Sequence, residues 1–201
     1  MKKLLYVLLF TPFFCAAQSE ASIRTLAKGV QESISETSFI LKDQSVLFQK
    51  VYSSNLSKNE LINKLKYFLP GVKNFQLTDG VNQTADQFSG RITDFIVNYQ
   101  KFGATDTGPG QLMAYGLNAN VIVQVKDNKY RVIISNLVFK GIGNGLSGTI
   151  SINSPFDDFI CKDHRNKFRT GQWFLLTAKI IDADLATSFD ITLNDTLSTD
   201  F

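Results

Sequence analysis

Apolar residues recur with the period of an α-helix in two parts of the chain. In "SKNELINKLKYFLPG", which begins at Ser57, residues at i, i+4 and i+7 form one apolar face: Leu61, Leu65 and Phe68. Ser57 and Glu60 have the spacing of a capping box, which satisfies backbone N–H groups at a helix start. From about Gln172 a longer stripe recurs at spacings of four, three, four and four: Phe174, Ala178, Ile181, Leu185 and Phe189. The pattern predicts two amphipathic helices, and the second is long enough to need a sheet beneath it.

Shorter stretches rich in β-branched and aromatic residues predict strands at 45–52, 73–79 and 89–99. The segment "ANVIVQVKDNKYRVIISNLVF" breaks at Asp127-Asn128, two residues that tolerate the positive φ of a tight hairpin turn. If Lys126 pairs with Lys129, alternation puts six apolar residues on one face: Val121, Val123, Val125, Tyr130, Val132 and Ile134. The other face then carries Gln124, Lys126, Lys129 and Arg131. We expect one face to be core and the other to be mostly wet.

The order of elements is strand, helix, four strands and helix. Because one sheet face is wet, this order favours an α+β fold, with an open antiparallel sheet of about five strands and helices on one face. Residues 45–190 are expected to form this single domain. Residues 18–44 are interpreted as a linker or loosely docked helix, and residues 191–201 as a frayed tail. A short helix is expected after Ser154 as N-cap and Pro155 as first residue.

The first residues, "MKKLLYVLLFTPFFCAAQ", have the composition of an export signal. Lys2 and Lys3 precede an apolar run of eleven residues, 4–14, which is shorter than the roughly 20 residues of a membrane-spanning helix. We expect residues 1–17 to be cleaved after Ala17, leaving Gln18 first. Acylation of Cys15 is the alternative, although Phe14 stands where that processing prefers a small residue. No later segment is long and apolar enough to span a membrane.

Charge and cysteine content limit the function classes. Loss of Lys2 and Lys3 lowers the basic residues from 21 to 19, against 18 acidic ones, so the mature chain has a net charge of about +1. A near-neutral exported chain is poorly suited to bind nucleic acid, because such binding needs a basic surface. Only Cys161 remains after cleavage, so the mature chain cannot form an intrachain disulfide.

Several of these segments resemble a known family. The segments are "LSKNELINKLKYFL", the "GRI" of strand 89–99 and, above all, "VIVQVKDNKYRVIISN". They are similar to an exported Bacteroidota family, domain of unknown function 4468, which is described as having a TATA-binding-protein-like fold. The resemblance spans about residues 46–139. It implies a fold and an exported location, and it brings no catalytic residues.

Two short motifs suggest chemistry. "GIGNGLSG" contains G-x-G-x-x-G at Gly143, Gly145 and Gly148, but extended chain follows it where a dinucleotide site needs a helix. We therefore interpret it as a turn. "CKDH" pairs Cys161 with the single histidine, His164, but too few ligands lie nearby for a zinc site. No catalytic, cofactor-binding or metal-binding residue is assigned, and no cofactor is expected.

Aspartates at 157, 158, 182 and 184 do not pair at spacings that share a helix face, and we expect solvated helix surfaces there. The long segment between Tyr99 and Leu117 is rich in glycine, and its ligand-loop candidates are Gly103, Gly108, Gly110 and Tyr115. We expect a non-enzymatic exported domain of the cell envelope that binds a protein partner or small ligand and no nucleic acid. The alternative is an enzyme of unknown reaction using Cys161 and His164.

Overall fold

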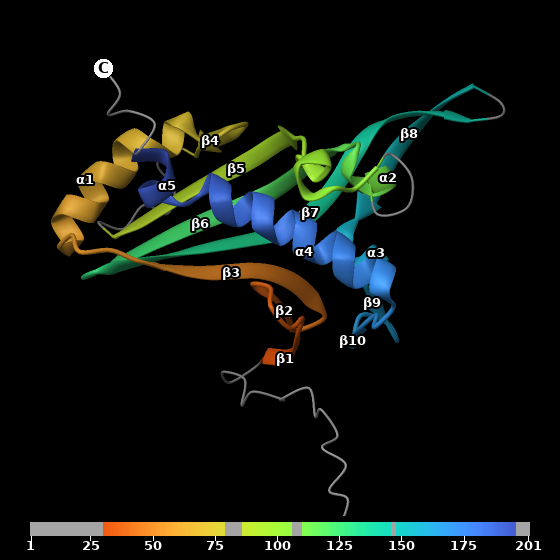
Figure 1. The fold of residues 1–201 in the computed structure, drawn as a ribbon, viewed down its shortest axis with the longest axis horizontal. Helices are drawn as coiled ribbons and strands as arrows, with labels where there is room; N and C mark the ends of the chain where they lie inside the picture. Colours follow the sequence, from red (N-terminus) through yellow and green to blue (C-terminus); the bar gives the residue numbers. More distant parts are fainter. Residues whose placement is uncertain (1–29, 79–85, 106–109, 146–147, 196–201) are drawn as a thin grey trace, which may run out of the picture.

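The computed structural model describes residues 30–78, 86–105, 110–145 and 148–195. An antiparallel sheet has the strand order β1-β2-β3-β7-β6-β5-β4, and β8 also pairs with β7 (Figure 1). Its strands are β1 (Val30–Ser33), β2 (Phe39–Lys42), β3 (Ser45–Ser53), β4 (Phe75–Leu77), β5 (Gln87–Phe95), β6 (Gly116–Lys126), β7 (Lys129–Gly145) and β8 (Gly148–Pro155). The described helices are α1 (Lys58–Phe68), α2 (Gly110–Met113), α3 (Phe156–Ile160), α4 (Gln172–Ser188) and α5 (Ile191–Asp195), with 3-10 turns η1 (Leu69–Gly71) and η2 (Tyr99–Phe102). The expected α+β class with an open antiparallel sheet is confirmed.

The central hairpin has the predicted register. Lys126 pairs with Lys129, Val123 with Val132, and Val121 with Ile134. Alternation buries one face of both strands: Val121, Val123, Val125, Tyr130, Val132 and Ile134 are each at most 2% exposed. The opposite face remains open, and we call it the outer face.

Helix α1 begins as the capping-box sequence predicts. The Ser57 N–H donates a hydrogen bond to the Glu60 carboxylate at 2.8 Å, and the Ser57 hydroxyl donates to the same oxygen at 2.6 Å. Leu61 and Leu65 on its apolar face are fully buried. The helix ends at Phe68, where η1 carries Pro70 and tightens the last turn.

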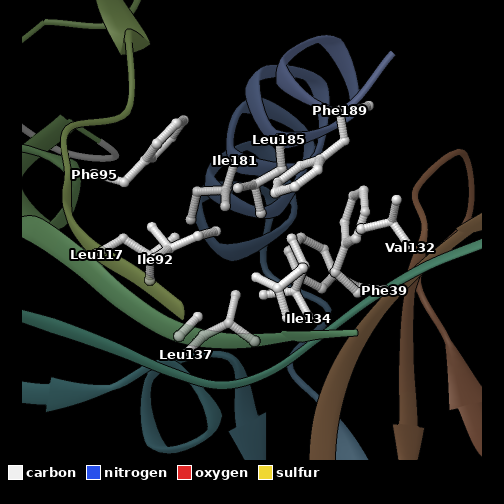
Figure 2. Packing of buried hydrophobic residues seen from close by; sticks show 14 of the residues in the cluster. Phe39, Ile92, Phe95, Leu117, Val132, Ile134, Leu137, Ile181, Leu185 and Phe189 are labelled. Atoms are coloured by element: carbon white, nitrogen blue, oxygen red, sulfur yellow. The ribbon is translucent and has the colours of Figure 1, made fainter. Parts of the chain in front are cut away.

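Helix α4 packs across the inner face of the sheet (Figure 1). Ala178, Ile181, Leu185 and Phe189 of the predicted stripe are at most 1% exposed, and Figure 2 shows the last three pointing at side chains from the strands. Trp173, in the first turn of α4, is 38% exposed. Its ring meets Phe159 of α3 edge-on at 5.1 Å between ring centres. The first turn of α4 thus packs on a neighbouring helix instead of the sheet.

The segment 18–44 is not a linker or loosely docked helix where the structure describes it. Residues 30–33 and 39–42 form strands β1 and β2, and Phe39 and Leu41 are fully buried. Together with β8, these two strands bring the sheet to eight strands, where the sequence predicted about five. Pairing of "FILK" with β3 makes this stretch part of the sheet.

The expectation of a frayed tail also needs correction. Residues 191–195 form α5, and Ile191 is 1% exposed, with its N–H bonded to the Tyr130 hydroxyl at 3.0 Å. Residues 196–201 lie outside the described residues. The short helix after residue 154 is confirmed as α3, but Pro155 is its N-cap, and Ser154 belongs to β8.

The expected signal peptide, residues 1–17, lies outside the described residues, together with Cys15 and the cleavage site at Ala17 and Gln18. Within the part of the chain that the structure describes, no helix combines the length and apolar character needed to cross a membrane.

Candidate functional site

The glycine motif lies in a β-hairpin. Gly143 and Gly145 end β7, Gly148 begins β8, and Gly145 pairs with Gly148. Strand therefore follows strand, and no helix start faces the glycines as a dinucleotide site requires. The three glycines of the motif thus lie in strands, and the residues between Gly145 and Gly148, where the turn was expected, lie outside the described residues.

Cys161 and His164 occupy different environments. Cys161 begins the short strand β9 (Cys161–Lys162), which pairs with β10 (Lys167–Phe168), and it is 3% exposed. Burial, and to a smaller extent the nearby Asp157 carboxylate, raises the pKa of its thiol to about 12. His164 is exposed in the turn between the two strands. A buried thiol held neutral is a poor nucleophile at pH 7.

The aspartates of α3 are joined by one arginine. Arg165 Nη2 lies 2.7 Å from Asp158 Oδ1, and its Nη1 lies 3.6 Å from Asp157 Oδ2. Burial raises the pKa of Asp157, although Arg165 acts in the opposite direction. No group of three His, Cys, Asp or Glu side chains among the described residues is placed to hold a metal ion.

The sequence predicted a solvated surface position for Asp182, but the side chain is buried. It is 8% exposed and accepts a hydrogen bond from the Ser38 N–H at 2.6 Å, which fixes the start of β2 against α4. Asp184 accepts from the Asn98 N–H at 2.9 Å, just before η2. Each carboxylate accepts a hydrogen bond from a backbone N–H group of another segment, and the two do not form an acid/base pair.

The glycine-rich segment contains η2 and α2. Gly103 has φ of 75° and caps η2, while a Cβ on Gly110 would come within 1.8 Å of the Thr105 carbonyl oxygen. The Tyr115 ring lies over Gly141 of β7. Gly108 is outside the described residues. These contacts give Gly103 and Gly110 structural roles, and the ligand-loop interpretation remains a prediction from the sequence.

Two β-bulges meet at the same point of β6. On the β5 side, Ile92 pairs with Ala119 and Phe95 pairs with Leu117, so two residues of β5 oppose one residue of β6. Asp94 in this bulge has φ of 54°. Bulges bend and twist a strand, redirect its side chains, and are frequent beside functional sites.

The second bulge is on the β7 side. Asn118 pairs with Val138 and Asn120 with Ser135, so again two residues of β7 oppose one of β6. Asn136 in this bulge also has φ of 54°. Because both bulges adjoin Asn118, the outer face is deformed from two sides at one place.

A groove of about 310 Å³ opens there, and we call it the bulge groove. Val138 lines it with an apolar side chain, whereas Ile92 and Ala119, which also adjoin it, are 1% and 6% exposed because their side chains face the core. Its polar side chains come from three adjacent strands: Arg91, Thr93, Asn118, Asn120, Asn136 and Lys140. Sequence reasoning missed all six. The alternating asparagines of "GLNANV" on an otherwise apolar strand were the signal that pointed to them.

The outer face is cationic around this groove. The residues of β3, β5, β6 and β7 include one acid, Asp94, whose carboxylate lies over Gly116. A smaller hollow of about 220 Å³ lies at the turn end of β6 and β7, lined by Val51, Gln124, Lys126, Lys129, Tyr130 and Arg131. There the Arg131 guanidinium donates to the Gln124 side-chain oxygen, whereas Arg91 and Lys140 form no ion pair with any described residue. Lys126 and Lys129 of the smaller hollow likewise form no ion pair with a described residue.

No protein-family model matches the chain, and no curated protein sequence matches it. It is similar to the solved structure of a TBP-like protein from Parabacteroides distasonis ATCC 8503, at 14% identity, with 79% of this chain and 96% of that chain covered and a TM-score of 0.46. It is also similar to a DUF4468 family protein from Bacteroides ovatus ATCC 8483, at 14% identity, with 83% and 93% covered and a TM-score of 0.43. Both names agree with the family resemblance that the capped helix and the central hairpin carry.

Proposed function

We propose that this chain is a non-enzymatic binding domain exported to the cell envelope, and that its ligand or partner binds in the bulge groove. The observation that carries the proposal is the convergence of two β-bulges on one point of β6, beneath a groove lined by two cations and three asparagines. Bulges that redirect side chains into an open concavity are an arrangement used for binding sites.

Export is supported by the composition of residues 1–17, with two lysines, an apolar run and a small-residue cleavage site. The enzyme alternative loses support because the Cys161 thiol is buried and its pKa is raised. Nucleic acid is a poor candidate partner for an exported chain of small net charge.

The test is to isolate the mature chain, residues 18–201, from its own organism and to record native and denatured masses. A bound molecule gives excess mass in the native spectrum that disappears on unfolding. Asn120→Trp fills the groove at an exposed strand position, so the variant is expected to fold and to lose the excess mass. Tyr67→Trp on α1, at a residue that is 87% exposed, is the matched control and should keep it.

Chemical crosslinking in the same preparations detects protein partners. The Asn120→Trp variant should lose the crosslinked partner, and the Tyr67→Trp variant should retain it. If wild type and Asn120→Trp carry the same bound mass and the same crosslinked proteins, the groove is not the binding site. Circular dichroism of both variants checks that the fold is retained.

A further inference from the structure

We propose that the bulge groove binds a saccharide that carries a carboxylate group, a step that rests on the proposed binding function. The carboxylate pairs with Arg91, Lys140 adds a second positive charge near the other end of the groove, and the sugar hydroxyls bond to the asparagine amides between them. The groove therefore selects for two features at once, a negative charge and neighbouring hydroxyl groups.

The positions of the two cations favour an anionic ligand. Arg91 pairs with Asn120 on the β5 side of β6, and Lys140 pairs with Gly116 on the β7 side. A ligand lying along β6 thus meets a cation near each end of the groove. The guanidinium group of Arg91 matches a carboxylate in planar, two-point geometry, and a bond of this kind is stronger than a bond between neutral groups.

One acid, Asp94, stands beside the groove at its Lys140 end. The groove lining contains no aspartate or glutamate. Asp94 is the nearest acid in sequence, and its carboxylate faces Gly116 at the edge of the site. An anion entering the groove is therefore attracted by two cations and meets no carboxylate in the lining.

The asparagines favour a sugar over a simple anion. A carboxamide both donates and accepts hydrogen bonds, as a sugar hydroxyl does, so the two match in either direction. Three carboxamides lie between the cations, at positions 118, 120 and 136, and the Thr93 hydroxyl adds a fourth group of the same kind. Among hydrogen bonds within the described residues, these three side chains make one, a long bond of 3.4 Å from the Asn118 amide to the Gly116 carbonyl.

The floor and size of the groove fit the same ligand. Val138 provides apolar contact for the C–H face of a sugar ring, whereas the Ile92 and Ala119 side chains face the core on the other side of the sheet. A volume of about 310 Å³ lies at the small end of ligand sites. The groove is open to the outside, so a longer acidic saccharide can continue beyond it.

The test measures binding of three probes to the mature chain by titration calorimetry at low ionic strength: glucuronate, glucose and inorganic phosphate. Glucuronate should bind at least about tenfold more tightly than glucose, because a hydrogen bond to a charged group contributes about 1.5–3 kcal/mol. It should also bind more tightly than phosphate, which lacks the hydroxyl pattern that the amides recognise.

Variants locate the site. Arg91→Gln should weaken glucuronate binding about tenfold, and Asn120→Ala should weaken both glucuronate and glucose several-fold. Arg131→Gln removes the same charge from the other hollow of the same face and should change affinity by less than about twofold. If Arg131→Gln weakens binding as much as Arg91→Gln, the attraction is diffuse and the assignment to the groove is wrong.

Other outcomes also overturn the inference. Equal affinity for glucose and glucuronate would show that the groove does not recognise the carboxylate. Tighter binding of phosphate than of glucuronate would show that it does not recognise the sugar. Absence of glucuronate binding up to about 10 mM contradicts the proposal outright. If Asn120→Trp removes the natural ligand while glucuronate does not bind, the proposed function stands and this inference fails. If glucuronate binding depends on Arg91 but Asn120→Trp leaves the natural complex intact, the groove binds acidic saccharides and the proposed function fails.

Discussion

At the scale of single residues, two buried tyrosines connect the sheet to the C-terminal helices. The rings of Tyr52 and Tyr130 stack at 4.8 Å between centres. The Tyr130 hydroxyl donates to the Phe189 carbonyl at 2.7 Å and accepts from the Ile191 N–H at 3.0 Å, whereas the Tyr52 hydroxyl donates once, to the Ala186 carbonyl. Tyr130→Phe should therefore lower the free energy of unfolding by about 1–3 kcal/mol, and Tyr52→Phe by about 1 kcal/mol. Urea denaturation measures both, and an equal or reversed order would contradict this account.

The same tyrosines predict how stability depends on pH. Burial raises the pKa of Tyr52 and Tyr130 above the ordinary value of about 10. The folded chain then keeps protons that the unfolded chain releases, so the free energy of unfolding is unaffected below pH about 10 and falls as pH rises above it. Tyr52→Phe should flatten this fall in denaturation curves between about pH 9 and 11. Tyr67→Phe, at an exposed site, should leave it unchanged.

Cys161 offers a chemical test of its environment. Because the thiol is buried and its pKa is raised to about 12, iodoacetamide at pH 7 should modify the folded chain at least about tenfold more slowly than the urea-unfolded chain. Mass spectrometry of timed samples measures both rates. A folded-state rate as fast as the unfolded one would restore the enzyme alternative.

At the scale of elements, sequence patterns predicted what is locally encoded. The α1 cap, the central hairpin register and α4 follow from spacing alone, since each depends on residues near one another in the chain. Strand β2 could not be predicted in the same way. "FILK" is only four residues long, and it becomes a strand because Phe39 pairs with Phe48 of β3 and packs against Phe156 of α3 at 5.2 Å between ring centres. Phe48 is a hairpin partner nearby in the chain, but the contact with Phe156 comes from distant sequence and leaves no local period.

Asp182 shows how such a distant element is held. Its carboxylate, on α4, accepts the Ser38 N–H at the start of β2. Asp182→Ala should lower the free energy of unfolding by about 1.5–3 kcal/mol and speed hydrogen exchange across residues 38–42. Asp182→Asn keeps an acceptor and should lose less. Asp184→Ala breaks an exposed bond to another element and serves as control, so an equal effect on residues 38–42 would argue against a specific role for Asp182.

At the scale of the whole molecule, the two faces of the sheet differ in how far the sequence predicts them. Alternation placed Gln124, Lys126, Lys129 and Arg131 on the wet face, and their strand register is confirmed. The bulge groove was not predicted, because it depends on where the pairing register shifts between β5, β6 and β7. The sequence carries only a weak signal for the two bulges. Asp94 and Asn136 belong to residue types that tolerate positive φ, but many residues in ordinary turns do so as well.

The arrangement of β7 predicts that the molecule unfolds as one unit. The first half of β7 pairs with β3 and its second half with β8, while α4 packs over the sheet between them. Ile181→Ala, at a fully buried position of α4, should cost about 2–5 kcal/mol and should speed hydrogen exchange in β3 and β5 together. Leu176→Ala is the matched control on the same helix, 44% exposed, and should change stability by no more than about 0.5 kcal/mol. If Ile181→Ala loosened β5 but left β3 protected, the sheet would consist of two separately stable parts, and α4 would not be the element that joins them.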